Sequence, residues 1–220
     1  MPDPHACALH LLNAGGALGD AVDDLRTCVE SAMARAQSLL PLPAVDVVLY
    51  HDPAFVLPET GSGGYSPCAQ RVFLAVDIGC HALDKAAFLQ GLRSLVAHEL
   101  HHCARWAGPG YGSTLGEALV SEGLACLFEA EMEGGPPPFY ARALSPAQLA
   151  EVEQAARSLW DRSDYGHERW FYGAAPGDLP RHAGYSLGYA LATAQARRTG
   201  LRASQLVHAP AATFLQSATA

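Results

Sequence analysis

The sequence predicts an α+β protein in which a small N-terminal sheet packs on a layer of helices. Short segments rich in β-branched and aromatic residues are confined to the first 78 residues, whereas helical periods dominate from residue 84 onward. Half of the 220 residues are hydrophobic and only 16% are charged, a composition that excludes a disordered chain. A chain of this length is typical of one hydrophobic core, so we expect a single compact domain over residues 1–220.

In the N-terminal part, a helix is expected over residues 19–40, where apolar side chains recur at steps of three and four. Pro41 and Pro43 end this helix, because proline lacks the amide hydrogen that a further turn needs. The segments expected to be extended are 6–12, 45–50 and 71–78, with a turn at 13–16 and a glycine-rich loop around 61–64.

The rest of the chain is predicted to be helical. Clusters of glycine and proline after residues 107 and 133 stop the first two of its helices. The expected helices are 84–106, 114–132, 146–160 and 185–198. Residues 161–184 form a long loop between the last two, and its aromatic side chains favour an ordered conformation.

Charge and hydropathy exclude several classes of partner. The chain has 14 Lys and Arg against 22 Asp and Glu, whereas binding of nucleic acid needs clustered positive charge. No apolar run approaches the roughly 20 residues of a membrane span, and residues 1–5 lack the positive charge of a secretory signal. The six cysteines form no CxxC pair, so we expect them to be mostly reduced. We therefore expect a cytoplasmic protein that contacts neither nucleic acid nor membrane.

The most informative segment is His-Glu-Leu-His-His at residues 98–102, an HExxH motif on the expected helix 84–106. Side chains four residues apart lie on one face of a helix, so His98 and His102 can reach the same metal ion. Glu99 then flanks the open coordination position.

The two histidines of this motif continue the inward apolar stripe of the helix. A buried histidine pair requires a ligand or hydrogen bonds, so a metal ion would satisfy it. The alternative is a pair of core histidines bonded to main-chain or carboxylate oxygens. His101 lies on a polar line of the same helix and is expected to be solvated.

Two histidines leave a zinc ion short of ligands, and the next helix offers Glu117 and Glu122. Five residues apart, these side chains point about 140° from each other and cannot face one ion. Glu117 follows Thr114 by three residues, which is the spacing of a capping box. Glu122 lies among apolar neighbours, where a carboxylate needs a cation, and Gly123 would let this helix approach the HExxH helix closely. We therefore choose Glu122 as the third ligand; a buried pair with an arginine is the alternative.

Cysteine offers a different type of ligand, from Cys103 or Cys126. A thiolate in place of Glu122 would give a softer and more closed site, better suited to storage or structure than to hydrolysis. No pair of cysteines has the spacing of a zinc finger, and buried cysteines are commonly unliganded. The ten histidines and six cysteines keep open an alternative function, a non-catalytic buffer or sensor for zinc or copper.

Further motifs follow the HELHH segment at intervals. They are Ser-Glu-Gly-Leu-Ala at 121–125, Trp-Phe-Tyr-Gly at 170–173 and Gly-Tyr-Ser-Leu-Gly-Tyr at 184–189. Over roughly residues 70–210 this pattern resembles the predicted bacterial zinc-dependent protease family, long known as a domain of unknown function and placed with the gluzincins.

The resemblance implies a zincin-like domain with His98, His102 and Glu122 as the zinc ligands and Glu99 as the catalytic base. One position departs from the wider gluzincin pattern. Many gluzincins place an Asp four residues after the Glu ligand to hold a ligand histidine, and here that residue is Cys126. The groups that orient the ligands must therefore come from elsewhere in the chain.

The activity implied is the hydrolysis of peptide bonds in a peptide or protein substrate, with zinc (Zn2+) as cofactor. Zinc with three protein ligands lowers the pKa of bound water to about 7, so Glu99 would accept its proton. A donor to the developing oxyanion is expected from Tyr185, His182 or Tyr172, and we choose Tyr185. Tyr185 and Tyr189 are also four residues apart, so a packed aromatic pair is the alternative role.

Overall fold

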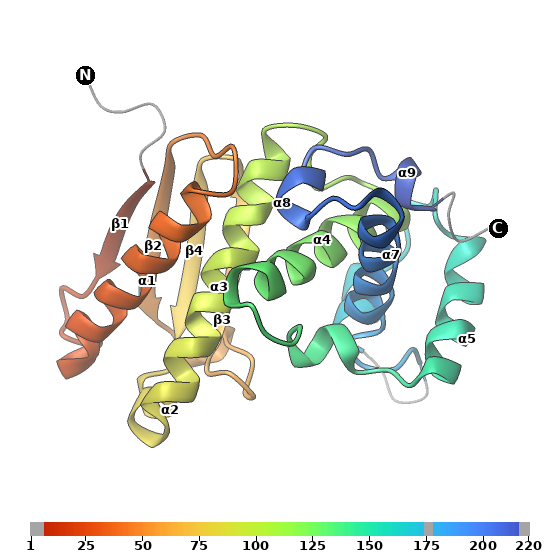
Figure 1. Cartoon of the computed structure of the whole chain (residues 1–220). Coiled ribbons are helices and arrows are strands. Elements are labelled where there is room, and N and C mark those ends of the chain that lie inside the picture. The colour runs from red at the N-terminus through yellow and green to blue at the C-terminus, as the bar shows by residue number, and fades with distance from the viewer. Residues whose placement is uncertain (1–6, 174–177, 216–220) are drawn as a thin grey trace. The chain divides into compact units, whose positions relative to one another are not determined.

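The computed structural model describes residues 7–173 and 178–215. The chain divides into two compact units, Met1–Ala107 and Gly108–Ala220, which are taken in turn (Figure 1). Residue 6 of the first expected strand and residues 174–177 of the expected loop lie outside the described residues. The single domain expected from the sequence stays a prediction. None of the helices in the described part of the chain is long and apolar enough to cross a membrane.

A four-stranded mixed sheet forms the first unit with its covering helices. The strands are β1 (Cys7–Leu12), β2 (Val45–His51), β3 (Ser62–Cys68) and β4 (Arg71–Val76), in the order β1-β2-β4-β3. Strands β1, β2 and β4 run parallel, and β3 pairs with β4 in the antiparallel sense at the edge. The alternating pattern of β2 and β4 buries Val47, Leu49, Val72 and Leu74 on one face.

Strand β3 was expected to be a loop, and this expectation was wrong. Glycine and proline have low strand propensity, so Gly63, Gly64 and Pro67 hide the strand in the sequence. The strand forms because it pairs with β4, in a register that begins with Ser62 opposite Val76. A side chain at Gly63 would come within 2.1 Å of the carbonyl oxygen of Phe55, so the close approach of these segments requires glycine.

Helices cover one face of this sheet. They are α1 (Val22–Gln37), which follows the 3-10 turn η1 (Gly19–Ala21), and α3 (Lys85–Trp106). Two shorter helices lie in the connections: η2 (Pro53–Phe55) between β2 and β3, and α2 (Ile78–Leu83) between β4 and α3. Figure 1 shows α1 and α3 crossing the same face of the sheet. The last strand ends two residues earlier than expected, because the carboxylate of Asp77 accepts a hydrogen bond from the Gly79 amide and caps α2.

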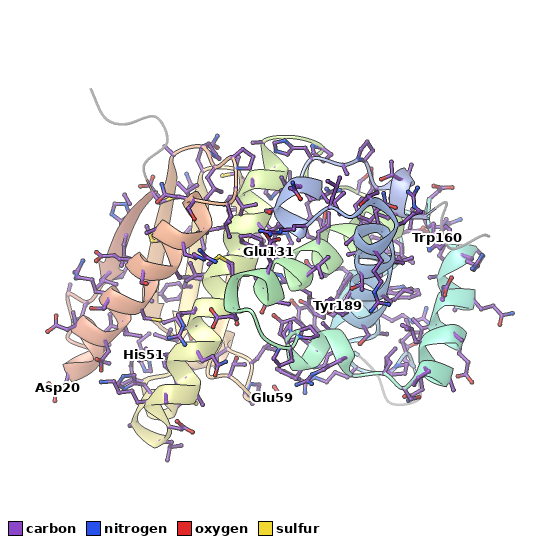
Figure 2. The ribbon with its side chains drawn as sticks, viewed as in Figure 1. Asp20, His51, Glu59, Glu131, Trp160 and Tyr189 are labelled. Atoms are coloured by element: carbon purple, nitrogen blue, oxygen red, sulfur yellow. The ribbon has the colours of Figure 1, made fainter. Side chains whose placement is uncertain are left out.

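The second unit is helical and is built around two long helices, α4 and α7. Its elements are α4 (Leu115–Glu133), η3 (Phe139–Arg142), α5 (Pro146–Arg157), α6 (His167–Phe171), α7 (Ala183–Thr199), α8 (Ala203–Leu206) and α9 (Ala212–Leu215). The first amides of α4 donate to carbonyl oxygens of a distant loop, Leu115 to Arg162 and Gly116 to Trp160, which is labelled in Figure 2. These bonds satisfy orphan donors and attach the helix start to the rest of the unit.

In the described parts of the segment 161–184, which are residues 161–173 and 178–184, aromatic side chains pack into the core, as the composition favoured. The segment contains the short helix α6, which the sequence analysis did not predict. Trp170 and Phe171 at the end of α6 are fully buried and pack in the core with Leu119 of α4 and Leu187 of α7. Tertiary packing of these large apolar side chains thus stabilises a helix that is too short to be stable by itself.

Gly123 has a different role from the one expected. Its missing side chain allows contact between α4 and α7, because a Cβ there would lie 2.0 Å from the carbonyl oxygen of Gly188. The reverse is also true, since a Cβ on Gly188 would lie 2.1 Å from the carbonyl oxygen of Leu119. The two helices therefore touch backbone to backbone at this point, as small residues permit.

We predict that Gly123→Ala destabilises the protein. Alanine favours a helix by about 1 kcal/mol over glycine, but the overlap with the Gly188 backbone should outweigh this and lower the free energy of unfolding by about 2 kcal/mol or more. Urea denaturation measures the difference. Gly91→Ala in α3 is the control, because its Cβ would meet Thr60 at an ordinary 3.7 Å. Equal stability of the two variants would contradict the backbone contact.

Candidate metal centre

The HExxH helix α3 is deeply buried at the motif. All residues from Val96 to Arg105 are buried, on every side of the helix. The start of α3 is fixed by Asp84, whose carboxylate accepts a hydrogen bond from the Ala87 amide. The helix therefore begins at a defined residue, and the motif lies roughly four turns further on, within its buried half.

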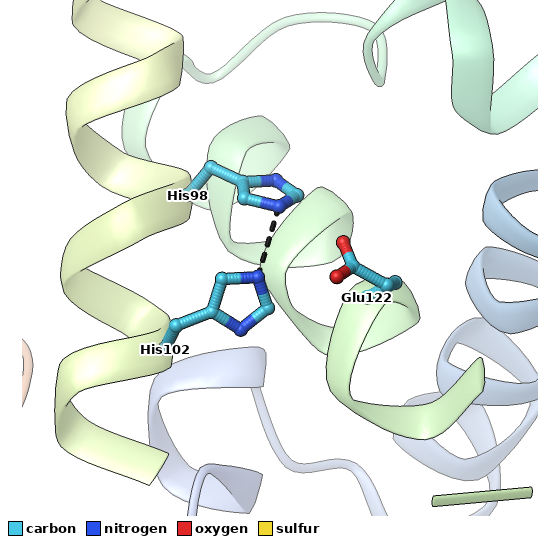
Figure 3. A group of neighbouring side chains, drawn as sticks. All are labelled: His98, His102 and Glu122. Atoms are coloured by element: carbon cyan, nitrogen blue, oxygen red, sulfur yellow. Dashed lines mark hydrogen bonds between the residues drawn. The ribbon is translucent and has the colours of Figure 1, made fainter. Parts of the chain in front are cut away.

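Within this buried half, the two motif histidines lie side by side on successive turns. The Nε2 atoms of His98 and His102 are 3.1 Å apart, as the dashed line in Figure 3 shows. Both side chains are 6% exposed. Two nitrogens bound to one tetrahedral zinc ion at 2.0–2.1 Å are separated by about 3.3 Å, so the pair fits a shared metal ion.

His101 does not lie in solvent, as its polar neighbours in sequence suggested, but is 0% exposed. Arg105, on the same line of the helix, is also buried. The helical stripe identified one buried face correctly, but α3 is covered on more than that face at this level. A single-stripe analysis assumes one solvated side and fails for such a helix.

The proposed base Glu99 lies against strand β3 of the same unit. Its carboxylate is 5% exposed, and its Oε2 atom accepts a hydrogen bond of 2.6 Å from the Ser66 hydroxyl. Gly64, two residues earlier on the strand, gives room to the other oxygen: a Cβ there would lie 2.5 Å from Oε1. The sequence analysis did not identify Ser66, because its 33-residue separation from Glu99 leaves no local signal.

In the second unit, Glu122 occupies a buried position on α4. It is 5% exposed, and Oε1 accepts a hydrogen bond of 2.7 Å from the hydroxyl of Tyr111. Ser121 in turn donates to the main-chain oxygen of Tyr111, at 2.7 Å, and so fixes the tyrosine. Tyr111 was also missed, since it lies in a glycine-rich turn with no periodic pattern. Hydrogen-bonded carboxylates of this kind are common among metal ligands.

The capping role expected for Glu117 is confirmed. Thr114 and Glu117 form a capping box, in which each side chain bonds the main-chain amide of the other residue. The same carboxylate accepts from the Ser113 amide at 2.8 Å. These bonds assign Glu117 to the start of α4, so that of the two glutamates considered as a third ligand Glu122 is the buried one.

Tyr185, the expected oxyanion donor, lies in an aromatic cluster of the second unit. Its ring contacts those of Tyr140, Phe171, Tyr172 and His182. Burial, and then the Glu122 carboxylate, hold the pKa of Tyr185 well above its usual range, so its hydroxyl stays a hydrogen-bond donor. A catalytic role for Tyr185 stays a prediction.

Of the two histidines in the expected loop 161–184, His182 lies in the turn before α7, whereas His167 lies in the short helix α6. His182 is the N-terminal cap of α7 with a positive φ of 65°, and it is 4% exposed. His167 is the first residue of α6, where its ring stacks on Phe171 and its Nδ1 lies 3.2 Å from the Tyr165 hydroxyl. Both therefore belong to the aromatic cluster.

The six cysteines all lie within the described residues, and none of them forms a disulfide there. Cys103 is fully buried, and its thiol contacts the main-chain oxygens of Cys68 and Arg71. Burial raises the pKa of Cys103 to about 12, which disfavours a thiolate in the absence of a cation. Cys126 is also fully buried.

Buried side chains of the types that bind metal ions are present in the described part of the chain. Two combinations have the composition of a three-ligand set: His98, His102 and Glu122, and His98, Cys126 and Glu129. The first contains the imidazole and carboxylate ligands of catalytic zinc sites, whereas the second brings in a thiolate. Glu122 is drawn with the two histidines in Figure 3.

Comparison with known proteins gave one result. The family model described as "Predicted Zn-dependent protease (DUF2268)" matches residues 25–216. No curated protein and no solved structure gave a significant match. The match spans the HExxH helix and all of α4, and thus every side chain predicted from the sequence to bind zinc.

We predict that Tyr111→Phe destabilises the metal-free protein. The variant removes a hydrogen bond to a buried carboxylate, and bonds to charged groups are worth about 1.5–3 kcal/mol. Tyr165→Phe is the matched control, because the hydroxyl of Tyr165 lies against an imidazole and its loss should cost about 1 kcal/mol or less. Urea denaturation with a chelator present measures both. A smaller effect for Tyr111→Phe than for the control would contradict the assigned bond.

Proposed function

Because this chain belongs to the DUF2268 family of predicted Zn-dependent proteases, we propose that it hydrolyses peptide bonds at a zinc ion held by His98, His102 and Glu122. The observation that carries the proposal is the buried histidine pair with Nε2 atoms 3.1 Å apart. Two neutral imidazoles and one carboxylate leave a tetrahedral ion one position for water or substrate.

The side chains fit this role in three respects. The histidine nitrogens converge, the Glu122 carboxylate is buried, and Tyr111 holds one of its oxygens. Burial excludes bulk water, which strengthens the binding of a cation by a carboxylate. When bound, zinc would lower the pKa of a water molecule toward neutrality and polarise the substrate carbonyl.

Glu99 is the proposed general base. It would accept one proton from the attacking water while the water oxygen bonds to the carbonyl carbon of the peptide. The same carboxyl group would then give this proton to the amide nitrogen as the carbon–nitrogen bond breaks. The second proton of the water stays on the new carboxyl group, and its transfer to the amine at neutral pH gives a carboxylate and an ammonium group as products, with Glu99 left ionised for the next turnover.

Tyr185 is proposed to donate a hydrogen bond to the oxyanion that develops on the carbonyl oxygen. Its raised pKa keeps the hydroxyl protonated throughout the neutral range. Tyr172, which is 47% exposed and contacts the Tyr185 ring, is the next candidate.

The substrate is proposed to be an extended peptide. Within the described residues, β4 is the one strand that pairs with β3. Elsewhere on β3 the Ser62 main chain is bridged to Leu57 and the Ser66 main-chain oxygen accepts from Trp106, so we propose the stretch between these two residues for main-chain hydrogen bonds to the substrate. Tyr65 on β3 and Phe55 beside it are 64% and 70% exposed and would contact substrate side chains. Because Ser66 and Gly64 of this strand adjoin Glu99, a peptide on β3 would pass close to the base.

A zinc or copper buffer or sensor is the competing function, and Cys126 is the feature that favours it. The side chains His98, Cys126 and Glu129 have the composition of a soft ligand set. A metal ion closed off by such ligands would have no need of Glu99, since the base acts on water at an open position.

We predict that the purified protein binds about one zinc ion, since the proposed residues supply one set of three ligands. The double variant His98→Ala/His102→Ala should lose the metal, and Glu122→Ala should lose or weaken it. Glu117→Ala is the matched control on the same helix, because its carboxylate caps α4. Elemental analysis after dialysis gives the content. Full zinc in the histidine variant would refute the site, and loss only in Glu117→Ala would refute the choice of Glu122.

We predict that Glu99→Gln keeps zinc but loses hydrolysis, by about 100-fold or more, because the amide cannot accept the proton. Cleavage of a peptide library measures the activity, and calorimetry of a peptide hydroxamate measures access to the metal. The hydroxamate should bind the zinc-loaded protein and not the metal-free protein. Fully loaded protein that neither binds the hydroxamate nor cleaves peptides would favour the buffer or sensor.

A further inference from the structure

We propose that Ser66 is a positioning residue for Glu99, holding one carboxylate oxygen so that the other is the oxygen that exchanges protons. The inference rests on the proposed function, because it assumes that Glu99 is the base. It concerns a residue outside the HExxH motif, on the edge strand of the sheet.

The hydroxyl of Ser66 lies between two oxygens of the same glutamate. Its Oγ atom is 2.6 Å from Glu99 Oε2 and 3.0 Å from the Glu99 main-chain oxygen. The hydroxyl has one hydrogen to donate, and the shorter contact, to the charged acceptor, is the stronger. Since Ser66 is only 7% exposed, this bond is shielded from competition with water.

An irregularity of β3 sets the direction of the Ser66 side chain. The pairing of β3 with β4 shifts register between Tyr65 and Cys68, which is the signature of a bulge. The indole Nε1 of Trp106, at the end of α3, donates to the main-chain oxygen of Ser66 at 2.9 Å. Strand and helix are thus bonded on both sides of Ser66, and its hydroxyl has little freedom to turn away.

Gly64 leaves space for the second carboxylate oxygen of Glu99, Oε1. A Cβ at this position would lie 2.5 Å from Oε1, so any side chain would displace the carboxylate. Gly64 is exposed, so Oε1 lies beside a point of β3 that water and substrate can reach. One oxygen is bonded to Ser66 and the other lies against Gly64 of the same strand, which fixes the orientation of the base.

The kinetic test compares Ser66→Ala with Ser62→Ala in the full-length, zinc-loaded protein. Ser62 is a buried serine of the same strand, 2% exposed, whose hydroxyl contacts Thr60. Ser66→Ala should retain zinc and KM but lose kcat by about tenfold or more, as expected for a bond to a charged group. Ser62→Ala should change neither constant by more than about twofold, and Ser66→Thr, which keeps the hydroxyl, should recover most of kcat.

A second readout does not depend on activity. The side-chain carboxyl carbon of Glu99 is observed by 13C NMR in glutamate-labelled protein at one neutral pH, and Glu99→Gln identifies its signal by removing it. This signal should move in Ser66→Ala and stay in place in Ser62→Ala. An unmoved signal in Ser66→Ala, or equal kcat for the two alanine variants, would overturn the proposal. A wild-type protein that cleaves no peptide would count against the proposed function alone, and the NMR comparison would still decide the role of Ser66.

Discussion

The candidate site depends on one close approach, that of two imidazole nitrogens 3.1 Å apart on a buried helix. With no metal ion, one Nε2 must carry a hydrogen and donate it to the other, so the pair then has a single Nε2 lone pair, which this hydrogen bond occupies. When both rings carry their hydrogen on Nδ1, each Nε2 has a lone pair. A single cation accepts both lone pairs at once. The helical repeat brings the rings to this separation, and the burial of α3 makes a strong ligand favourable.

Buried carboxylates in both units accept hydrogen bonds from neutral hydroxyl groups. Ser66 bonds Glu99 in the first unit, Tyr111 bonds Glu122 in the second, and Tyr140 bonds the buried Glu129 at 2.7 Å. A hydroxyl supports a carboxylate without cancelling its charge, whereas an arginine would neutralise it. A carboxylate that accepts a hydrogen bond from a hydroxyl keeps its negative charge and can still attract a metal ion or a proton.

Local spacing accounts for the parts of the molecule that the sequence predicted. The histidine pair and the capping box of α4 each depend on residues three or four apart, so the helical period reveals them. Strands β2 and β4 were recognised by their β-branched and aromatic residues, and β1 by its short apolar run. Strand β3 was not, because Gly63, Gly64 and Pro67 carry no strand signal and the pairing with β4 makes the strand.

Contacts distant in sequence explain the remaining differences. Ser66 reaches Glu99 across 33 positions, and the side chain of His101 is buried by packing that one helical stripe does not report. Tyr111 lies only 11 positions from Glu122, but in a turn whose path depends on Gly110 and Gly112, both with positive φ. Such groups support the chemistry without belonging to its motif, and only the folded chain identifies them.

The backbone contact between Gly123 and Gly188 also has a mechanical meaning for the carboxylate beside it. Helices separated by long side chains can shift relative to each other when those side chains change rotamer. Two helices in backbone contact have no intervening side chains that could adjust in this way. Glu122 precedes Gly123 and is therefore carried on a stiff part of the unit. In the proposed role of Glu122 as a zinc ligand, its carboxylate would need little reorganisation when a cation binds, so the stiffness of the neighbouring helix contact would contribute to metal affinity.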